Sequence, residues 1–138
     1  MTTFSLEFEP KSLERSRRGG ITGIICFDFG GNRFPGDGWS DFVVNILGWW
    51  LDAIREPRIG MVLRFMDGPY LIRARDVGTD SILLDCIESR KVEHVVFSSL
   101  VELVDLQSEI SRVARAVLAE CRKRNWSSAE IERLNHLP

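Results

Sequence analysis

Residues that build catalytic and metal sites are scarce in this sequence of 138 residues, which holds two histidines and three cysteines. The cysteines, Cys26, Cys86 and Cys121, are odd in number and widely spaced, which disfavours both a disulfide framework and a zinc site. Cys26 and Cys86 lie in apolar runs, and Cys121 continues the apolar stripe of a predicted helix. We therefore expect three buried free thiols, as is typical of proteins in a reducing compartment.

The chain also lacks an excess of charge of one sign, because 18 basic and 20 acidic residues give a formal net charge of −2. Nucleic-acid binding usually needs a basic surplus that displaces counterions from phosphates, so no nucleic-acid partner is expected. A local basic cluster at Arg15, Arg17 and Arg18 is interpreted as a solvated loop. No apolar run approaches the roughly 20 residues of a membrane helix, and no signal peptide is evident. We expect a cytoplasmic protein without a membrane partner.

Sequence motifs of known chemistry are missing as well. None of the patterns GxxxxGK(S/T), HExxH, CxxC or GxSxG occurs. Gly30 and Gly31 follow a predicted strand, but several residues and a proline separate them from the next predicted helix, so they cannot place a phosphate at its N-terminus. We therefore predict no catalytic residue, no cofactor and no metal, and expect that the protein is not an enzyme.

The sequence does contain enough apolar residues for one domain, spanning residues 1–138. Hydrophobic residues make up 44% and charged residues 28%, which is ordinary for a globular protein. Phe4, Leu6 and Phe8 alternate with polar residues and predict a strand. Similar runs predict further strands at residues 21–29, 61–66, 70–77, 81–88 and 92–97.

Apolar residues at steps of three and four predict three helices. The first covers residues 40–55, with Ser40 as its N-cap. Capping boxes formed by Ser99 with Glu102, and by Ser127 with Glu130, predict the starts of a long second helix and a short third one. The expected fold class is α+β: an antiparallel sheet of five or six strands, one helix inserted after the second strand, and two C-terminal helices packed on one face.

Aromatic residues are concentrated between residues 34 and 50. Trp39 and Val44 stand at the positions of a hydrophobic staple, and Trp50 follows the apolar stripe of the first helix, so both tryptophans are expected to be structural. Trp49 points about 100° away from Trp50, which places it at the edge of that stripe. Because tryptophan is enriched in interface hot spots, Trp49 is a candidate contact for a protein partner.

Three aspartates accompany this segment. Asp37 and Asp41 bracket the expected helix start, where capping and the helix dipole account for them more simply than a metal does. Asp67 and the following glycine are a hairpin signal, but Pro69 lacks the N–H of a tight turn, so a looser turn is expected. The candidate partner-binding residues are Asp37, Asp41, Trp49, Asp67 and Tyr70.

Three segments in this order, FPGDGWSDFVV at residues 34–44, LGWW at 47–50 and FMDGPY at 65–70, resemble small bacterial proteins of the immunity type. Such proteins are encoded beside polymorphic or contact-dependent toxins. The resemblance, which extends over about residues 21–100, implies a cytoplasmic protein that binds and neutralises a cognate toxin domain. It implies neither the activity of that toxin nor a binding face, because both differ between immunity families.

Two other functions stay open at this point. A small hydrolase-like enzyme could use Asp37, Asp41 and His94, although His94 is in phase with apolar residues of the last predicted strand and is expected to be a partly buried structural histidine. A homo-oligomeric structural subunit could instead pair through the Trp49 side of the first helix. The oligomeric state is therefore not predicted.

Overall fold

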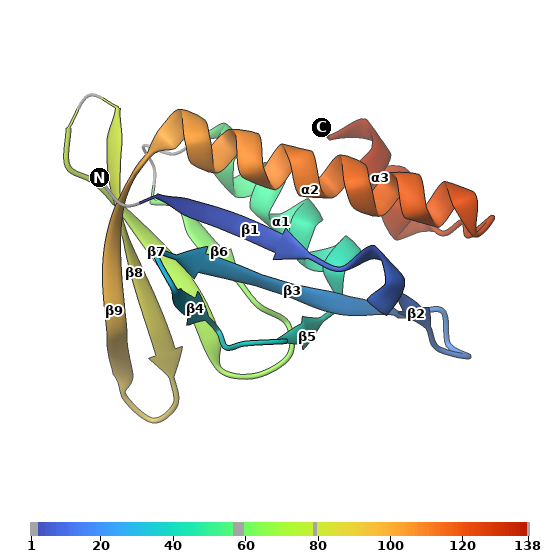
Figure 1. Cartoon of the computed structure of the whole chain (residues 1–138), viewed down its shortest axis with the longest axis horizontal. Coiled ribbons are helices and arrows are strands. Elements are labelled where there is room, and N and C mark those ends of the chain that lie inside the picture. Colours follow the sequence, from blue (N-terminus) through green and yellow to red (C-terminus); the bar gives the residue numbers. More distant parts are fainter. Residues whose placement is uncertain (1–2, 57–59, 79, 138) are drawn as a thin grey trace.

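The computed structural model of the chain describes residues 3–56, 60–78 and 80–137 and confirms the α+β class (Figure 1). None of the helices in those ranges combines the length and apolarity that a membrane span requires. In chain order the elements are β1 (Phe4–Phe8), the 3-10 helix η1 (Pro10–Ser12), β2 (Glu14–Arg15), β3 (Ile21–Phe29), β4 (Asn32–Phe34), β5 (Ser40–Asp41), α1 (Val43–Arg55), β6 (Val62–Arg64), β7 (Tyr70–Asp76), β8 (Ser81–Ser89), β9 (Glu93–Glu102), α2 (Leu103–Lys123) and α3 (Ala129–His136).

The strands form two antiparallel sheets instead of the single sheet expected. In the first sheet β1, β2, β4 and β5 all pair with the long strand β3. In the second sheet β6, β7, β8 and β9 follow one another as a meander. The sequence did not reveal β2, β4 and β5, because they have only two or three residues each, too few for an alternating pattern to show.

Helix α1 begins at Val43, later than expected. Ser40 and Asp41 form β5 and pair with β3, so Ser40 is not a helix N-cap and the staple predicted at Trp39 does not form. Pairing with β3 determines the backbone of these residues more strongly than their local capping preference does.

The two capping boxes nearer the C-terminus are also wrong. Ser99 and Glu102 belong to β9, and α2 begins only at Leu103. The N-cap of α3 is Ser128 and not Ser127, since the Ser128 Oγ accepts a hydrogen bond from the α3 backbone at 3.1 Å. In both cases a suitable spacing occurs close to a helix start, and tertiary structure decides where the helix begins.

The helices cover the first sheet, and α2 runs along β1 (Figure 1). Two side chains of α2 close the edge of that strand: Glu109 accepts a hydrogen bond from the Leu6 N–H at 3.3 Å, and Arg112 donates one to the Leu6 carbonyl at 2.9 Å. Helix α1 packs against β3 and β6. Its Trp50 is fully buried, as predicted, with its ring 5.4 Å from that of Phe27.

The β8–β9 hairpin projects away from the helices, at the lower left of Figure 1. Strand β9 is at the edge of its sheet, because among the described strands it pairs with β8 alone. The register shifts between the pairs Cys86–Phe97 and Ile87–Val95, so that Val96 is the extra residue of a β-bulge. The outer edge of β9 is therefore bent but uncovered.

Cys26, Cys86 and Cys121 are all buried and free, as predicted. Burial raises the pKa of Cys26 to about 11 and that of Cys86 to about 12. It also raises the pKa of Cys121. The three thiols are thus protonated side chains of the interior, not nucleophiles.

Candidate functional site around Asp41 and the edge strand β9

The segments that carry the immunity resemblance meet in space. The indole N–H of Trp50 donates to the Arg64 carbonyl at 2.8 Å, and the Trp50 ring lies 5.2 Å from that of Phe65. Phe34 stands edge-on to Phe65 and to Tyr70, with ring centres 5.9 and 5.6 Å apart. The aromatic segment and the loop at 65–70 are therefore two halves of one packed contact that joins the first sheet and α1 to the second sheet.

Asp41, which is 1% exposed, is the polar centre of this contact. Its carboxylate accepts hydrogen bonds from the indole N–H of Trp39 at 3.0 Å and from the backbone N–H groups of Phe42 at 2.7 Å and Met66 at 3.2 Å. The Asp67 N–H reaches both oxygens, at 3.3 and 3.2 Å. A buried carboxylate requires such partners. Asp41 thus ties the start of α1 to the 66–69 loop and offers no surface to a protein partner.

Trp39 and Tyr70 pack edge to face, with ring centres 5.2 Å apart. Gly68 lies against the indole with φ of +93°, and a Cβ there would stand 2.8 Å from Cη2 of Trp39. Only glycine fits this position, for conformational and steric reasons alike. Residues 66–69 form bends and no tight turn, which agrees with the expectation drawn from Pro69.

Asp41, Asp67 and Tyr70 are brought together, whereas Trp49 and Asp37 lie apart from them. Trp49 is 40% exposed on α1 and borders a hollow of about 60 Å³ between α1 and α3, which Leu134 also lines. Its exposure fits its expected place at the edge of the apolar stripe. Contact of Trp49 with a partner stays a prediction.

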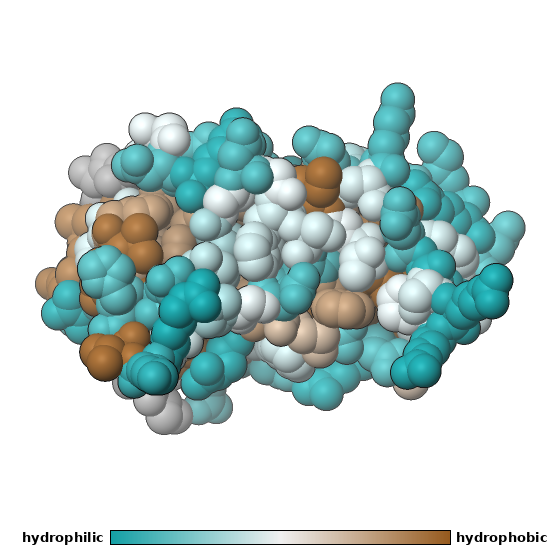
Figure 2. Space-filling view, turned by 90° about the horizontal axis from the view of Figure 1, so that it is seen from below, coloured by the Kyte–Doolittle hydropathy of each residue, from teal (hydrophilic) through white to brown (hydrophobic). Residues whose placement is uncertain are grey.

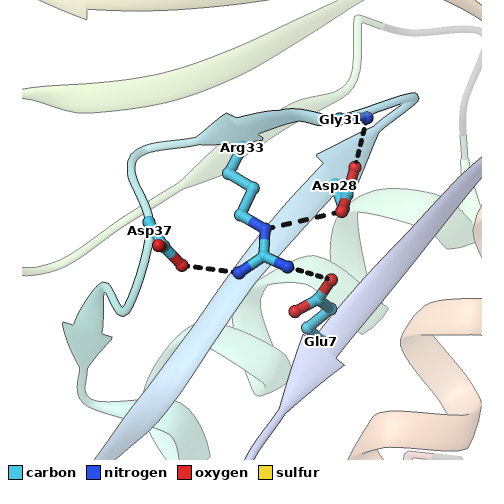
Figure 3. A network of polar contacts seen from close by, with 5 residues as sticks. All are labelled: Glu7, Asp28, Gly31, Arg33 and Asp37. Atoms are coloured by element: carbon cyan, nitrogen blue, oxygen red, sulfur yellow. Dashed lines mark hydrogen bonds and ion pairs between the residues drawn. The ribbon is translucent and has the colours of Figure 1, made fainter.

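Asp37 is exposed and pairs with Arg33 of β4 (Figure 3). The same guanidinium lies 3.4 Å from a carboxylate oxygen of Glu7 and 3.5 Å from one of Asp28. A hydrogen bond from the Gly31 N–H, 2.7 Å long, lowers the pKa of Asp28, and Arg33 adds to this effect. Asp37 therefore pairs with Arg33 at the surface and keeps an accessible carboxylate.

The three residues of the hydrolase-like alternative are not assembled into a site. No hydrogen bond or ion pair joins any two of Asp37, Asp41 and His94 in the described ranges. His94 is exposed on β9 opposite Glu88, so the expectation of a partly buried histidine is wrong, because β9 is an edge strand. Within the same ranges no three metal-ligating side chains cluster. The expectation that the chain is not an enzyme stays a prediction.

Strand β9 and the turn before it carry an apolar surface that the sequence did not single out. Val92, Val95 and Val96, here called the valine strip, are 76, 48 and 49% exposed. In Figure 2 hydrophobic side chains gather mainly at the left end, which holds the β8–β9 hairpin. The strip escapes sequence analysis because a valine-rich run predicts a strand without showing which strand lies at an edge.

Charged pairs border the valine strip. Arg73 donates two hydrogen bonds of 2.9 Å to Glu93, and Arg75 donates two of 2.8 and 3.2 Å to Asp85. The Ser98 hydroxyl adds a third to Asp85 at 2.6 Å. Burial raises the pKa of Asp85, but the hydrogen bonds from Arg75 and Ser98 outweigh it and leave the pKa below its ordinary value. The border is therefore ionised and fixed at neutral pH.

No family model, curated protein or solved structure matches the chain. A function can therefore be inferred only from the resemblance of the three sequence segments and from the geometry described above. That geometry also includes a second feature that the sequence did not indicate, a hollow of about 390 Å³ between the β2–β3 turn and the starts of α1 and α3.

Proposed function

We propose that the chain is an immunity-type protein that binds and neutralises a cognate bacterial toxin domain in the cytoplasm, with the valine strip in its contact surface. The observation that carries the proposal is the exposure of Val92, Val95 and Val96 along an edge strand. The resemblance of residues 34–44, 47–50 and 65–70 to immunity proteins supports it.

A free strand edge is a template for pairing with another chain, and proteins ordinarily cover or charge it. Strand β1 follows this rule, since Glu109 and Arg112 occupy its edge. Strand β9 keeps exposed valines at its edge, and its bulge at Val96 limits regular edge-to-edge aggregation. An apolar centre with a polar border is the usual composition of a protein interface.

The other candidate residues have distinct roles in this proposal. The charged pairs beside the strip affect partner choice and association rate more than affinity. Asp37, Trp49, Asp67 and Tyr70 are further candidate contacts. Asp41 acts indirectly, because it holds the loop that presents Asp67 and Tyr70.

The test uses the toxin domain encoded beside the gene for this chain. The wild-type chain should restore growth of cells that make this domain and should co-elute with it. We expect Val95→Lys to weaken the complex at least about tenfold, because it buries a charge in an apolar contact. Val104→Lys is the matched control, since Val104 is also exposed (58%) but lies on α2, and it should bind as the wild type does.

The absence of a toxin gene beside this one, or the failure of both growth rescue and co-elution, would contradict the proposal. Light scattering of the chain alone separates toxin binding from self-association. A dimer that Val95→Lys dissociates, without any binding to the toxin domain, would assign the valine strip to contact between two copies.

A further inference from the structure

The hollow of about 390 Å³ lies on a different part of the surface from the valine strip. Three segments meet around it: the turn that links β2 to β3, the first turn of α1 and the first turn of α3. Its lining includes Arg15, Arg18, Phe42, Asn45, Met66 and Glu130.

One wall of the hollow is cationic. Arg15 donates a hydrogen bond to the Ser127 carbonyl at 2.8 Å, which holds its guanidinium against the start of α3. In the described part of the chain, neither Arg15 nor Arg18 forms an ion pair with a carboxylate. Glu130 is the one acidic residue among the lining residues. The lining therefore holds two arginines and one acidic residue, which leaves a surplus of positive charge.

The turn that carries these arginines is well ordered by its own hydrogen bonds. The Ser16 N–H donates to the Gly20 carbonyl at 2.8 Å, and the Gly19 N–H donates to the Ser16 carbonyl at 2.9 Å. The Gly20 N–H in turn donates to the Ser16 Oγ at 3.1 Å. These hydrogen bonds fix the backbone of the turn from which both arginines line the hollow.

Another part of the lining is apolar. A Cβ on Gly20 would stand 3.2 Å from the Phe42 ring, so the glycine allows the turn to close on the aromatic side chain. Phe42 and Met66 provide apolar contact area, and Asn45 provides a side-chain amide. Met66 is 42% exposed although it lies next to the buried contact around Asp41. A ligand that suits both parts of the lining has a negative group and an apolar body.

We propose that this hollow, the arginine pocket, binds a small organic anion. The guanidinium groups of Arg15 and Arg18 would receive its carboxylate or phosphate, for which their planar donors are well suited. The apolar or aromatic body would lie against Phe42 and Met66. This site does not depend on the proposed binding of a toxin domain.

The experiment is a titration of the full chain with phenyl phosphate, followed by the backbone amide NMR signals of Gly19, Gly20 and Asn45. We expect saturable shifts with a Kd of about 1 mM or tighter. Phenol and inorganic phosphate should each bind at least about tenfold more weakly. Phenol lacks the negative group for the arginines, and inorganic phosphate lacks the apolar body for Phe42 and Met66. Benzoate in place of phenyl phosphate shows whether a carboxylate serves as well as a phosphate.

Substitutions of two neighbouring arginines distinguish binding in the arginine pocket from a general effect of the positive charge of the loop. Arg18→Gln should weaken phenyl phosphate binding at least about fivefold, because it removes one charged hydrogen-bond donor. Arg17→Gln changes the same charge on an exposed side chain that does not line the hollow, and it should leave the Kd unchanged.

Three results would overturn the proposal. The first is the absence of saturable shifts at these amides up to about 20 mM phenyl phosphate. The second is equal weakening by Arg17→Gln and Arg18→Gln, and the third is equal binding of phenol. Failure of toxin binding would not count against the pocket, and an empty pocket would not count against toxin binding.

Discussion

The carboxylate of Asp41 receives the backbone N–H of Asp67 between its two oxygens, at 3.3 Å from Oδ1 and 3.2 Å from Oδ2. Asp41 and Asp67, which the sequence suggests as partner contacts, are therefore linked, because Asp41 holds the loop that contains Asp67. The buried carboxylate fixes where Asp67 and Tyr70 stand on the surface. The position of the exposed Asp67 therefore depends on the buried Asp41.

We predict that Asp41→Asn lowers the free energy of unfolding by about 2–3 kcal/mol. An amide has one acceptor oxygen, and its NH₂ group would face N–H donors of Met66 or Asp67 that are now paired. Chemical denaturation measures the loss. Asp37→Asn is the matched control: Asp37 has an 82% exposed side chain and should denature as the wild type does. Equal stability of the two variants would show that Asp41 is not the anchor.

Gly68→Ala should destabilise the protein by about 1–3 kcal/mol, because alanine at φ of +93° is strained and its Cβ would overlap Trp39. Gly36→Ala serves as the control, since nothing lies within 4 Å of a Cβ at Gly36 and its φ is not positive. Thermal unfolding of both variants checks this. If the two shift alike, Gly68 is not required by its contact with Trp39.

The sequence predicted the long elements and failed at the short ones. All six strands expected from alternation exist, as do the three helices, because those patterns extend over many residues. The helix start at Ser40 was wrong because β5 pairs with β3, a contact that no local pattern encodes. The same limit applies to Ser99, whose capping-box spacing was convincing although the residue continues a strand.

Alanine substitutions of the adjacent serines Ser98 and Ser99 of β9 are expected to differ in their effect on stability. The Ser99 hydroxyl is buried without a hydrogen-bond partner in the described structure, so Ser99→Ala should keep or raise stability by up to about 1 kcal/mol. Ser98→Ala removes the 2.6 Å hydrogen bond to Asp85 and should lower stability by about 1 kcal/mol. Urea denaturation measures both. A larger loss for Ser99→Ala than for Ser98→Ala would contradict the assignment.

The rate at which the three thiols react at a given pH tests whether they are buried. A raised pKa means that the folded protein holds the thiol proton more tightly than free cysteine does, so thiolate is scarcer at any given pH. With a pKa of about 11 for Cys26, roughly one molecule in a thousand carries its thiolate at about pH 8. Ellman's reagent should therefore react slowly with the native protein and at once in guanidinium chloride. Fast reaction of the native thiols at about pH 8 would disprove their burial.

The candidate site was only partly visible in the sequence. Candidate contacts were chosen from both the aromatic segment and the loop at 65–70, and the structure packs these two segments against each other. The sequence did not indicate that Asp41 is buried, since aspartate is usually a surface residue. Nor did it indicate the valine strip, because Val95 is exposed where the β8–β9 hairpin projects away from the helices.

Amide hydrogen exchange of the chain, alone and bound to the proposed toxin partner, tests most directly whether the valine strip is a contact surface. We expect slower exchange in the complex at residues 92–97, where β9 gains a partner, and no change in β1, whose edge α2 already closes. Unchanged exchange at residues 92–97 together with new protection elsewhere, for instance around Trp49, would contradict the assignment of the valine strip as the contact surface.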